Sequence, residues 1–300
     1  MSSSSVDTIK EKLDIAEVIG SYIKLEKAGA NLKARCPFHN EKTPSFFVSP
    51  NRGSYYCFGC GAKGDIFTFV QEFEGVDFRG ALKTLALKAG VELELENPKV
   101  RSENDRLYAV LEEAVSFYEK KLKEEKIASD YVKKRGINNE SVREWRIGYA
   151  PNEWRDLHAY LLKAGFTNAE MLKVGLIKKS EKQVGEHEFY DTFRGRVVFP
   201  IFDTNGRPIA FSGRIIIDDD KAPKYLNSPE TILFNKSETL YGLHIAKVEI
   251  RRKDYSVLVE GQMDLVMSHQ AGINNTVASS GTALTSLHLE KLKKLSNKII

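Results

Sequence analysis

Two short pairs of metal-binding residues constrain this chain more than any other feature of its sequence. Cys36 and His39 form the first pair, and Cys57 and Cys60 form the second pair after an interval of 17 residues. Each pair lies in a short turn, so its two side chains can converge on one ion. Three sulfur ligands and one nitrogen ligand suit tetrahedral Zn²⁺. Because four protein ligands leave no position for a substrate water, the sequence predicts a structural zinc site that helps a small module to fold.

The cysteine content of the chain supports this interpretation. All three cysteines lie between Cys36 and Cys60, and a paired disulfide framework would leave one of them over. Metal ligation in a reducing compartment fits better than the alternative, three buried structural cysteines beside an incidental histidine. No segment of the sequence approaches the roughly 20 apolar residues that a membrane span requires. We therefore expect a cytoplasmic protein.

The zinc module also has a charge pattern that is typical of single-stranded DNA binding. The whole chain carries a net charge of only +4, so an argument for nucleic-acid binding must rest on local charge. Between Lys27 and Gly64, six basic residues accompany one acidic residue, Glu41. Aromatic residues, including Phe46, Phe47, Tyr55, Tyr56 and Phe58, lie among them, and bases can stack on such rings while lysine and arginine bind phosphates. The candidate contacts in this module are Lys33, Arg35 and Lys63.

The aromatic residues of the module have a second interpretation. A small domain needs apolar side chains for its core, and charged residues commonly form its solvated surface. Taken one at a time, Phe46, Phe47 and Tyr56 favour the core.

Periodicity divides the chain into segments. An amphipathic helix is expected over Asp14–Tyr22, a small antiparallel sheet over Lys27–Gly64, and two further helices follow Asp65. These segments make residues 1–96 a zinc-ribbon-type domain. The polar, proline-containing stretch 97–105 lacks periodicity and is predicted to be a linker.

The rest of the chain is predicted to be a mixed α/β core. Residues 106–252 begin with helical patterns that continue to about Ala164, and Arg196–Phe202 and Pro208–Ile217 then indicate a β-hairpin. Residues 253–300 alternate between strand and helix, which indicates the start of a parallel α/β sheet. The expected fold class is therefore α+β and multidomain.

The motifs in this order closely resemble those of bacterial DNA primases. The zinc pairs lie in CPFHNEKTPSFFV and YYCFGCGAKGD, and the resemblance then runs through nearly the whole chain. Its later motifs are WRIGYAP, FRGRVVFPIFD, IAFSGR, PKYLNSPET, LYGL, VEGQMD and VASSGTAL. The resemblance implies a DNA-dependent RNA polymerase that makes short RNA primers, and it identifies residues 253–300 as the start of a TOPRIM fold.

The resemblance also implies catalytic positions. Glu260 matches the acidic residue that ends the first TOPRIM strand and binds Mg²⁺ or Mn²⁺, and Asp264 matches the acidic residue four places later. Asp264 has an alternative role as the cap of the following helix. Cations and metal-binding carboxylates are what phosphoryl transfer from a nucleoside triphosphate requires. Basic residues within or beside the motifs match positions that contact template, primer or nucleotide: Arg146, Arg194, Arg196, Arg214, Lys224 and Lys236.

Two positions depart from the family pattern without removing an acid or a base. Gln262 replaces a common tyrosine in VEGYMD, and Asn235 precedes Lys236 where histidine is usual. The run Asp218–Asp220 is expected to be an exposed loop rather than a metal site, because consecutive carboxylates point in different directions and repel one another.

The resemblance further implies partners and limits. We expect a monomer at the bacterial replication fork that binds single-stranded template, ribonucleoside triphosphates and the RNA primer–DNA hybrid. The family's Asp-x-Asp pair is expected beyond Ile300, so residues 1–300 alone should be inactive, and the helicase-binding C-terminal domain should also be absent. One alternative is a zinc-ribbon DNA-binding module with a non-catalytic TOPRIM scaffold. A topoisomerase or nuclease is disfavoured, because those enzymes need other catalytic groups.

Overall fold

The chain divides into two compact units in the computed structural model, which describes residues 5–39, 41–76, 78–91, 98–180, 188–217, 222–279 and 283–300. The first unit comprises Met1–Glu96 with Lys247–Ser256 and Glu290–Ile300. The second unit comprises Asn97–Ala246 and Val257–Leu289. Among the described residues, no helix is both long and apolar enough to cross a membrane.

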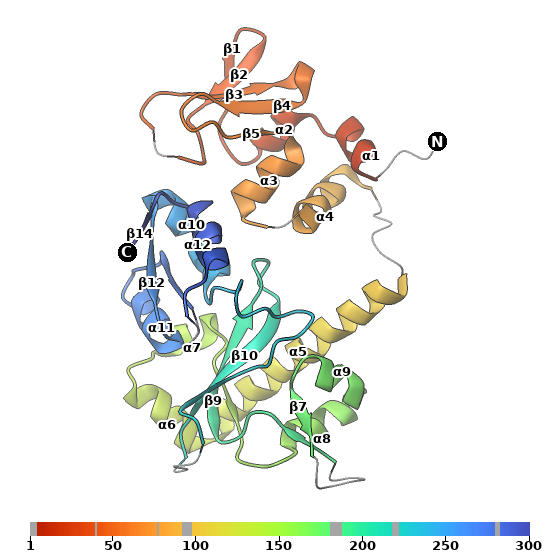
Figure 1. Ribbon diagram of the computed structural model, residues 1–300, viewed down its shortest axis with the longest axis vertical. Helices are drawn as coiled ribbons and strands as arrows, with labels where there is room; N and C mark the ends of the chain where they lie inside the picture. The colour runs from red at the N-terminus through yellow and green to blue at the C-terminus, as the bar shows by residue number, and fades with distance from the viewer. Residues whose placement is uncertain are drawn as a thin grey trace. The chain divides into compact units, whose positions relative to one another are not determined.

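The first unit contains a five-stranded antiparallel sheet in the order β1-β2-β3-β4-β5 (Figure 1). This sheet confirms the prediction for Lys27–Gly64. Phe46, Val48 and Tyr55 pack on its inner face in one core with the helices. The strands are β1 Glu26–Ala28, β2 Asn31–Ala34, β3 Phe46–Ser49, β4 Ser54–Cys57 and β5 Lys63–Gly64. The helices are α1 Ser5–Lys12, α2 Ile15–Gly20, α3 Ile66–Glu74 and α4 Phe78–Ala89, and a short 3₁₀ turn, Pro50–Arg52, joins β3 to β4.

Two aspartates fix where helices of the first unit begin. Asp14 Oδ1 accepts the N–H of Ala16 at 2.7 Å, which caps α2. Asp65 Oδ1 accepts the N–H groups of Phe67 and Thr68 at 3.1 and 3.0 Å, which caps α3. These bonds satisfy N–H groups that have no partner within the helix. Both helix starts agree with the sequence prediction.

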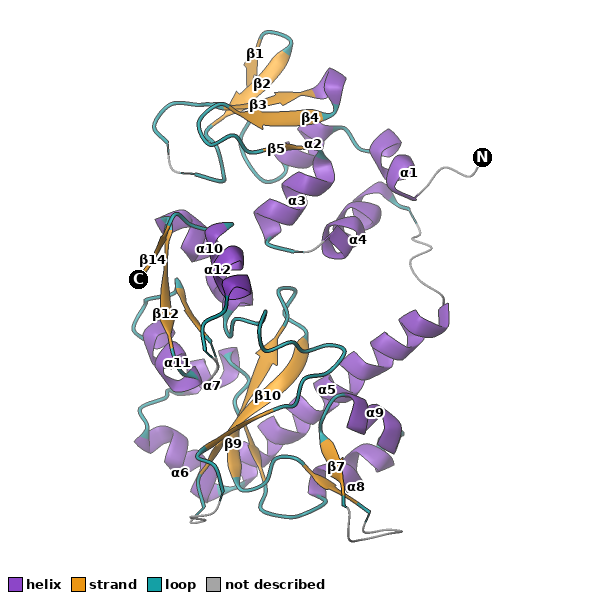
Figure 2. Ribbon diagram, viewed as in Figure 1, coloured by secondary structure: helices purple, strands orange, loops and turns teal. Residues whose placement is uncertain are grey.

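The second unit contains a four-stranded sheet in the order β11-β10-β9-β6, and its two longest strands, β9 and β10, are labelled in Figure 2. Strands β9, Arg196–Phe202, and β10, Pro208–Ile215, pair antiparallel and confirm the predicted hairpin. Strands β6, Gly148–Ala150, and β11, Tyr225–Asn227, lie at the two edges. Strand β6 interrupts a region that the sequence pattern predicts to be mostly helical.

A long helix, α5, packs against this sheet. It explains two differences from the sequence prediction, the helical start within the predicted linker and the presence of strand β6. It spans Pro98–Glu124, so the segment predicted as a linker is helical from Pro98 onward. Proline fits the first turn of a helix, where its missing N–H would have no partner, so Pro98 begins the helix instead of breaking it. The helix also approaches β6 closely, because a Cβ on Gly148 would lie 2.4 Å from the Cβ of Tyr118. Three residues suffice for β6 because it is held between α5 and β9.

Short elements complete the second unit before the last sheet. Two strands, β7 Ile177–Lys179 and β8 Phe189–Asp191, form an antiparallel ribbon. The short helices are α6 Lys126–Lys134, α7 Asn139–Glu144, α8 Asp156–Lys163 and α9 Asn168–Lys173.

The end of the chain forms a parallel three-stranded sheet in the order β13-β12-β14. The predicted alternation of strands and helices is confirmed. The strands are β12 Tyr255–Val259, β13 Thr276–Ala278 and β14 Lys298–Ile299. The helices are α10 Leu243–Lys253, α11 Gln262–Gln270 and α12 Ser286–Lys293. The aspartate run at 218–220 and residues 280–282 of the VASSGTAL motif lie outside the described residues.

Candidate zinc centre, carboxylate edge and nucleic-acid interface

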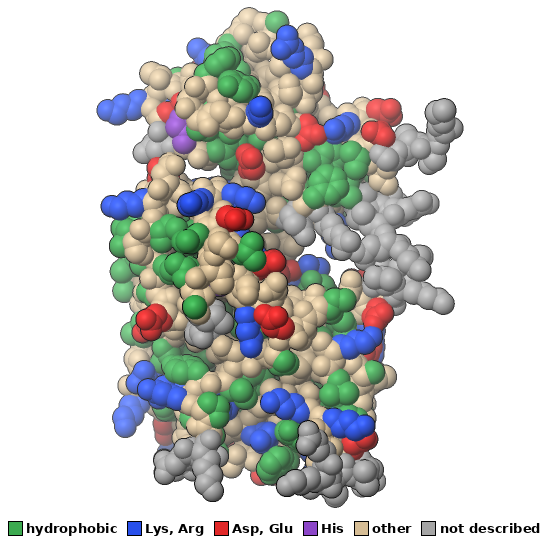
Figure 3. Space-filling model, in the orientation of Figure 1, with side chains coloured by type: hydrophobic (Ala, Val, Ile, Leu, Met, Phe, Trp, Pro, Cys, Tyr) green, Lys and Arg blue, Asp and Glu red, His purple; other side chains and the backbone are tan. Residues whose placement is uncertain are grey.

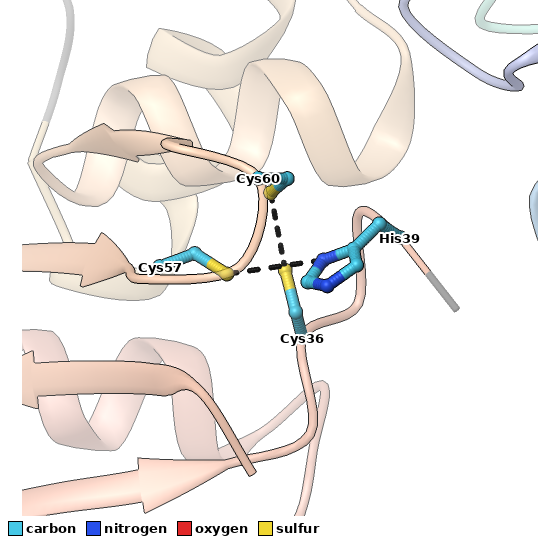
Figure 4. A group of neighbouring side chains, drawn as sticks. All are labelled: Cys36, His39, Cys57 and Cys60. Atoms are coloured by element: carbon cyan, nitrogen blue, oxygen red, sulfur yellow. Dashed lines mark hydrogen bonds between the residues drawn. The ribbon is translucent and has the colours of Figure 1, made fainter. Parts of the chain in front are cut away.

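The four predicted metal ligands converge at one end of the first unit's sheet (Figure 4). The ligand atoms of Cys36, His39, Cys57 and Cys60 all lie within 4.8 Å of one another. The sulfur atoms of Cys36 and Cys60 are 3.8 Å apart, and Cys57 Sγ is 3.8 Å from His39 Nδ1. Around a tetrahedral zinc ion with bonds of about 2.3 Å, two sulfur ligands lie roughly 3.8 Å apart. The cluster therefore has the dimensions of a closed zinc site.

Glu41 joins the two ligands of the first pair, Cys36 and His39, to Ser45. Its Oε1 accepts the N–H of Cys36 at 2.6 Å and that of Ser45 at 3.0 Å. Its Oε2 lies 3.3 Å from His39 Nε2 and also accepts a hydrogen bond from the Ser45 hydroxyl. With Nε2 directed at the carboxylate, His39 presents Nδ1 to the sulfur atoms. A carboxylate behind a histidine ligand fixes the ring orientation and the tautomer.

The backbone of the second ligand turn lies close to the His39 ring. A Cβ on Gly59 would lie 2.5 Å from His39 Nε2 and 2.9 Å from the Ser45 hydroxyl. Only glycine leaves room for the ring at this position. Gly61 has a φ of +77°, which glycine adopts without strain and which lets the second turn close.

The two buried thiols, Cys36 and Cys57, have different proton affinities. Burial raises the pKa of Cys36, because a thiolate there loses hydration. Burial acts in the same direction on Cys57, but hydrogen bonds from Ser45 and from the N–H groups of Cys60 and Gly59 outweigh it and lower the pKa of Cys57. A cation bound between them would supply the charge that stabilises the Cys36 thiolate.

The outer face of the first unit's sheet carries one cross-strand row of basic and aromatic side chains. Lys33 lies opposite Phe47, Phe47 opposite Tyr56, and Tyr56 opposite Lys63. Directly opposite residues share a face of the sheet, so two lysines flank two aromatic rings. Phe58 adds a third ring, with its centroid 5.5 Å from that of Phe47 and 4.9 Å from that of Tyr56. Arg35, just after β2, is also exposed.

Burial separates the aromatic residues that the sequence could not separate. Phe46 is fully buried, as predicted, and Phe47 is partly buried. Tyr56 is 43% exposed and Phe58 is 72% exposed, so the core assignment of Tyr56 is wrong. The reason is strand alternation, because β3 and β4 turn every second side chain away from the core.

In the second unit, the basic residues predicted to bind nucleic acid differ in accessibility. Lys224 is exposed and immediately precedes β11, and the Arg214 guanidinium lies 5.0 Å from the ring centroid of Tyr225. Arg196 is only 4% exposed, and it donates to the carbonyls of Gly213 and Pro223 at 3.0 and 2.9 Å. The register places the side chains of Arg196 and Arg214 on opposite faces of the sheet, because Arg196 pairs with Ile215 and Arg214 pairs with Val197.

Two other predicted basic positions are bonded to acidic residues, Arg146 through its side chain and Lys236 through its backbone. Arg146 forms ion pairs with Glu112 at 2.6 Å and Glu119 at 2.9 Å, both from α5. The backbone N–H of Lys236 donates to Glu230 at 3.3 Å. The guanidinium carbon of Arg194 is 4.2 Å from the ring centroid of Trp154. Figure 3 shows lysine and arginine side chains interspersed with acidic ones over the visible face, as the small net charge suggests.

The predicted catalytic carboxylates lie together at the carboxyl end of β12. Glu260 directly follows the strand and is exposed, and Gly261 is the N-cap of α11. Asp264 lies in the first turn of α11 and is also exposed. No side chain caps this helix, so the alternative role of Asp264 as a cap is wrong. An open parallel sheet presents its functional groups at this edge.

Comparison with known proteins assigns the chain to a family. The CHC2 zinc finger model matches residues 1–101, the DNA primase catalytic core N-terminal domain matches residues 117–247, and the Toprim domain matches residues 254–300. The crystal structure of the zinc-binding and RNA polymerase domains of Aquifex aeolicus primase is 38% identical, with a TM-score of 0.60, and the match covers 99% of this chain and 72% of that one. The chain belongs to the DnaG-type DNA primase family.

Other members of the primase family agree with this assignment. The DNA primase of Clostridium acetobutylicum is 40% identical over 98% of this chain and 49% of its own length. A DnaG primase catalytic domain bound to single-stranded DNA is 35% identical, with a TM-score of 0.59, and the match covers 66% of this chain and 63% of that domain. The chain spans about half the length of the curated relatives it matches. The predicted family, the fold class and the zinc-finger and Toprim modules are confirmed, and the CHC2 match together with the Cys and His cluster supports bound Zn²⁺.

Two residues with clear structural roles, Glu41 and Asp191, were not predicted from the sequence. Glu41 lies between the two ligand pairs in the sequence. Its position two residues after His39 is the sequence feature that could have indicated its contact with the histidine ligand. Asp191 is buried and accepts the N–H groups of Leu157 and His158 at 2.9 Å, which starts α8. Burial raises the pKa of Asp191 to about 7. No pattern in the sequence distinguishes this aspartate from the many exposed ones.

Proposed function

We propose that this chain carries the template-binding and nucleotide-binding parts of a DNA primase, a DNA-dependent RNA polymerase that makes short RNA primers for replication. The observation that carries the proposal is the position of Glu260 at the carboxyl end of β12, with Asp264 one helical turn away in a Toprim sheet. In an open α/β sheet this edge is where ligands bind. Membership of the primase family supports the activity, and ribonucleoside triphosphates are the expected substrates.

Two kinds of metal site follow from the donor atoms. Cys36, His39, Cys57 and Cys60 hold one structural Zn²⁺, because three thiolates and an imidazole at these distances match its preferred ligands. Glu260, with Asp264 beside it, offers the oxygen ligands that Mg²⁺ or Mn²⁺ prefers. A bound divalent ion would neutralise charge on the triphosphate. Two carboxylates form only part of a two-metal site, so we expect residues 1–300 alone to bind substrates without synthesising primer.

Template binding is assigned to two surfaces. In the first unit, the row of Lys33, Phe47, Tyr56 and Lys63 combines rings on which bases can stack with cations that can bind phosphates. Arg35 and Phe58 extend this surface. Its stacking area is solvent-exposed, which a purely structural role for the rings does not require.

In the second unit, Arg214 and Lys224 are the primary phosphate contacts. Lys224 is exposed, and the Arg214 guanidinium is held beside Tyr225. Arg196 acts indirectly in this proposal, because its guanidinium holds the carbonyl of Pro223, next to Lys224. Arg146 and Lys236 are secondary contacts, and Arg146 would have to exchange its glutamate partners for phosphate.

A primer-synthesis assay tests the proposed function. The full-length protein that contains residues 1–300 is incubated with single-stranded template, labelled ribonucleotides and Mg²⁺. We expect short RNA products that depend on both template and divalent ion. DNA binding without any synthesis would favour the alternative, a zinc-ribbon module that binds single-stranded DNA beside a non-catalytic Toprim scaffold.

A further inference from the structure

The helix that follows β13, α12, begins with a reciprocal cap built from Thr285 and His288. The Thr285 hydroxyl accepts the N–H of His288 at 3.1 Å, and the Thr285 N–H donates to His288 Nδ1 at 3.4 Å. A capping box has this pattern, with Ser or Thr before the helix and Glu or Gln three residues later. In α12 the histidine takes the place of the Glu or Gln. Because Nδ1 accepts a backbone N–H, the ring carries its proton on Nε2.

Both capping side chains have one further donor, and both donors bond the same loop. His288 Nε2 donates to the carbonyl of Lys236 at 3.0 Å, and the Thr285 hydroxyl donates to the carbonyl of Ser237 at 2.6 Å. His288 has no exposed surface, so water does not compete for its bond. The first turn of α12 therefore holds two consecutive peptide groups of a loop that is 48 or more residues away in the sequence.

The N–H groups of this loop are bonded by residues of the loop itself and of the segment before it. The side-chain oxygen of Asn235 accepts the N–H of Ser237 at 2.9 Å, and its carbonyl accepts the N–H of Glu238 at 3.2 Å. The Lys236 N–H donates to Glu230 at 3.3 Å. The cap of α12 supplies donors for the carbonyls, so the backbone is fixed on both sides of Lys236. The Lys236 side chain stays partly exposed.

The same segment is also joined to the carboxyl end of the Toprim sheet. Five residues after Lys236, Tyr241 exchanges two backbone hydrogen bonds with Ala278, at 2.8 and 3.0 Å. Ala278 is the last residue of β13 and lies opposite Val259, which Glu260 follows directly. A helix that follows a parallel strand begins at the edge where that strand ends. Both attachments therefore hold the loop at the edge that carries Glu260.

We propose that His288, with Thr285, is a positioning residue that holds Lys236 at this edge, where the ammonium group binds a phosphate of the ribonucleoside triphosphate. The inference rests on the proposed function and sharpens the secondary phosphate contact assigned to Lys236. The charge of a lysine lies at the end of a flexible stem, so a fixed backbone limits where it can reach. Fixing the backbone before the nucleotide arrives reduces the entropy lost on binding.

Two substitutions separate the roles of the two ring nitrogens. In His288→Gln the amide nitrogen can take the place of Nε2 and donate to Lys236, whereas the shorter side chain of His288→Asn reaches only the place of Nδ1. Primer synthesis by the full-length protein is measured against ribonucleotide concentration. We expect His288→Asn to raise KM about tenfold with kcat within about twofold of the parent, because only binding is weakened. His288→Gln should restore a KM close to that of the parent.

His269→Asn is the matched control. His269 is also buried, and its Nε2 bonds the carbonyl of Thr276 in β13 rather than one in the loop. Thermal unfolding should show that both asparagine variants lose stability, whereas KM should rise in His288→Asn alone. Equal KM values for the two variants would overturn the proposal.

A double-mutant cycle shows whether His288 acts through Lys236. Lys236→Ala alone should raise KM at least as much as His288→Asn does. Adding His288→Asn to Lys236→Ala should then cause little further change, because the group that His288 positions is already gone. Additive effects of the two substitutions would mean that His288 only stabilises the fold, and the proposal would be wrong.

The outcomes separate this inference from the proposed function. A parent protein that makes no primer would refute the proposed function, and the inference would fall with it. An active parent whose KM is unchanged by Lys236→Ala would refute the inference alone. Should His288→Asn fail to fold, Thr285→Val removes the hydroxyl that donates to Ser237 and decides the question. A raised KM that disappears in the Lys236→Ala background supports the proposal, and a KM like that of His269→Asn overturns it.

Discussion

The zinc cluster and the carboxylate edge of the Toprim sheet are organised in opposite ways. The four zinc ligands come from two turns of one small sheet, lie within 4.8 Å of one another and are supported by Glu41, Ser45 and Gly59. Glu260 and Asp264 are exposed, and among the described residues they belong to no group of three or more His, Cys, Asp or Glu side chains that could hold a metal ion. The first arrangement stabilises a fold when metal binds, and the second leaves open positions for substrate. Changes to the zinc cluster should therefore cost folding, whereas changes to the carboxylates should cost chemistry.

The largest effect is expected from removing two zinc ligands. Cys57→Ser combined with Cys60→Ser leaves two ligands, and structural zinc contributes about 10 kcal/mol or more to the folding of small zinc modules. We expect zinc content to fall from one ion per chain to near zero and the strands of the first unit to unfold. Elemental analysis and far-ultraviolet circular dichroism measure the two changes. Lys42→Ala, an exposed position between the ligand pairs, should keep the metal. Full zinc content in the double variant would contradict the ligand assignment.

A smaller effect on the same cluster is expected from Glu41→Gln. The amide keeps the shape of the side chain but loses the charge that orients His39, and loss of such a partner typically lowers metal affinity about 10- to 100-fold. Competition with a chromophoric chelator measures this affinity. Glu26→Gln on the exposed edge of β1 is the control and should bind zinc like the parent. Equal affinities for the two variants would show that Glu41 supports only the loop.

In the second unit, Arg214→Ala combined with Lys224→Ala should weaken DNA binding without changing zinc content. Each phosphate contact on a single strand contributes about 0.7 to the slope of log affinity against log salt, so the slope should decrease by about 1.4. Fluorescence anisotropy between low and moderate salt measures it. Lys120→Ala with Lys123→Ala removes the same charge from an exposed face of α5 and should leave the slope closer to that of the parent. Identical slopes for parent and test variant would exclude this surface.

The smallest effect concerns the buried carboxyl of Asp191. Its folded-state pKa is about 7, raised by burial, whereas an unfolded aspartate titrates near 4. Between these values the folded state binds more protons than the unfolded state, so the contribution of Asp191 to stability falls as the pH rises. Relative to Asp191→Asn, the parent should lose about 2 kcal/mol of stability between pH 5 and pH 7.5.

Urea unfolding, followed by the emission of the buried Trp145, measures this difference at each pH. Asp130→Asn, an exposed position on α6, provides the matched comparison and should follow the parent. Parallel pH profiles for the parent and Asp191→Asn would mean that the carboxyl stays ionised in the folded protein.

The same contrast explains what could be predicted from the sequence. The zinc ligands, the sheet that carries them and the capping by Asp14 and Asp65 follow from spacing over a few residues. The strand and helix order around Glu260 follows from local alternation. The different environments of Arg196 and Arg214 could not be predicted from local sequence. Only the pairing of β9 with β10 shows that the Arg196 guanidinium is buried against backbone carbonyls. The environments of Trp154 and Asp191 could not be predicted for the same reason, because their partners lie more than 30 residues away in the sequence.

The measurement that tests the account most directly compares Glu260→Gln with the parent in the full-length protein. Glutamine keeps nearly the same volume and removes the charge that should hold the divalent ion at the carboxyl end of β12. Primer synthesis on a single-stranded template, zinc content and DNA affinity are measured on the same preparations. The account predicts that synthesis falls by at least about 100-fold while zinc content and DNA affinity stay at the parent values. Robust primer synthesis by Glu260→Gln would contradict it and would place the catalytic centre elsewhere.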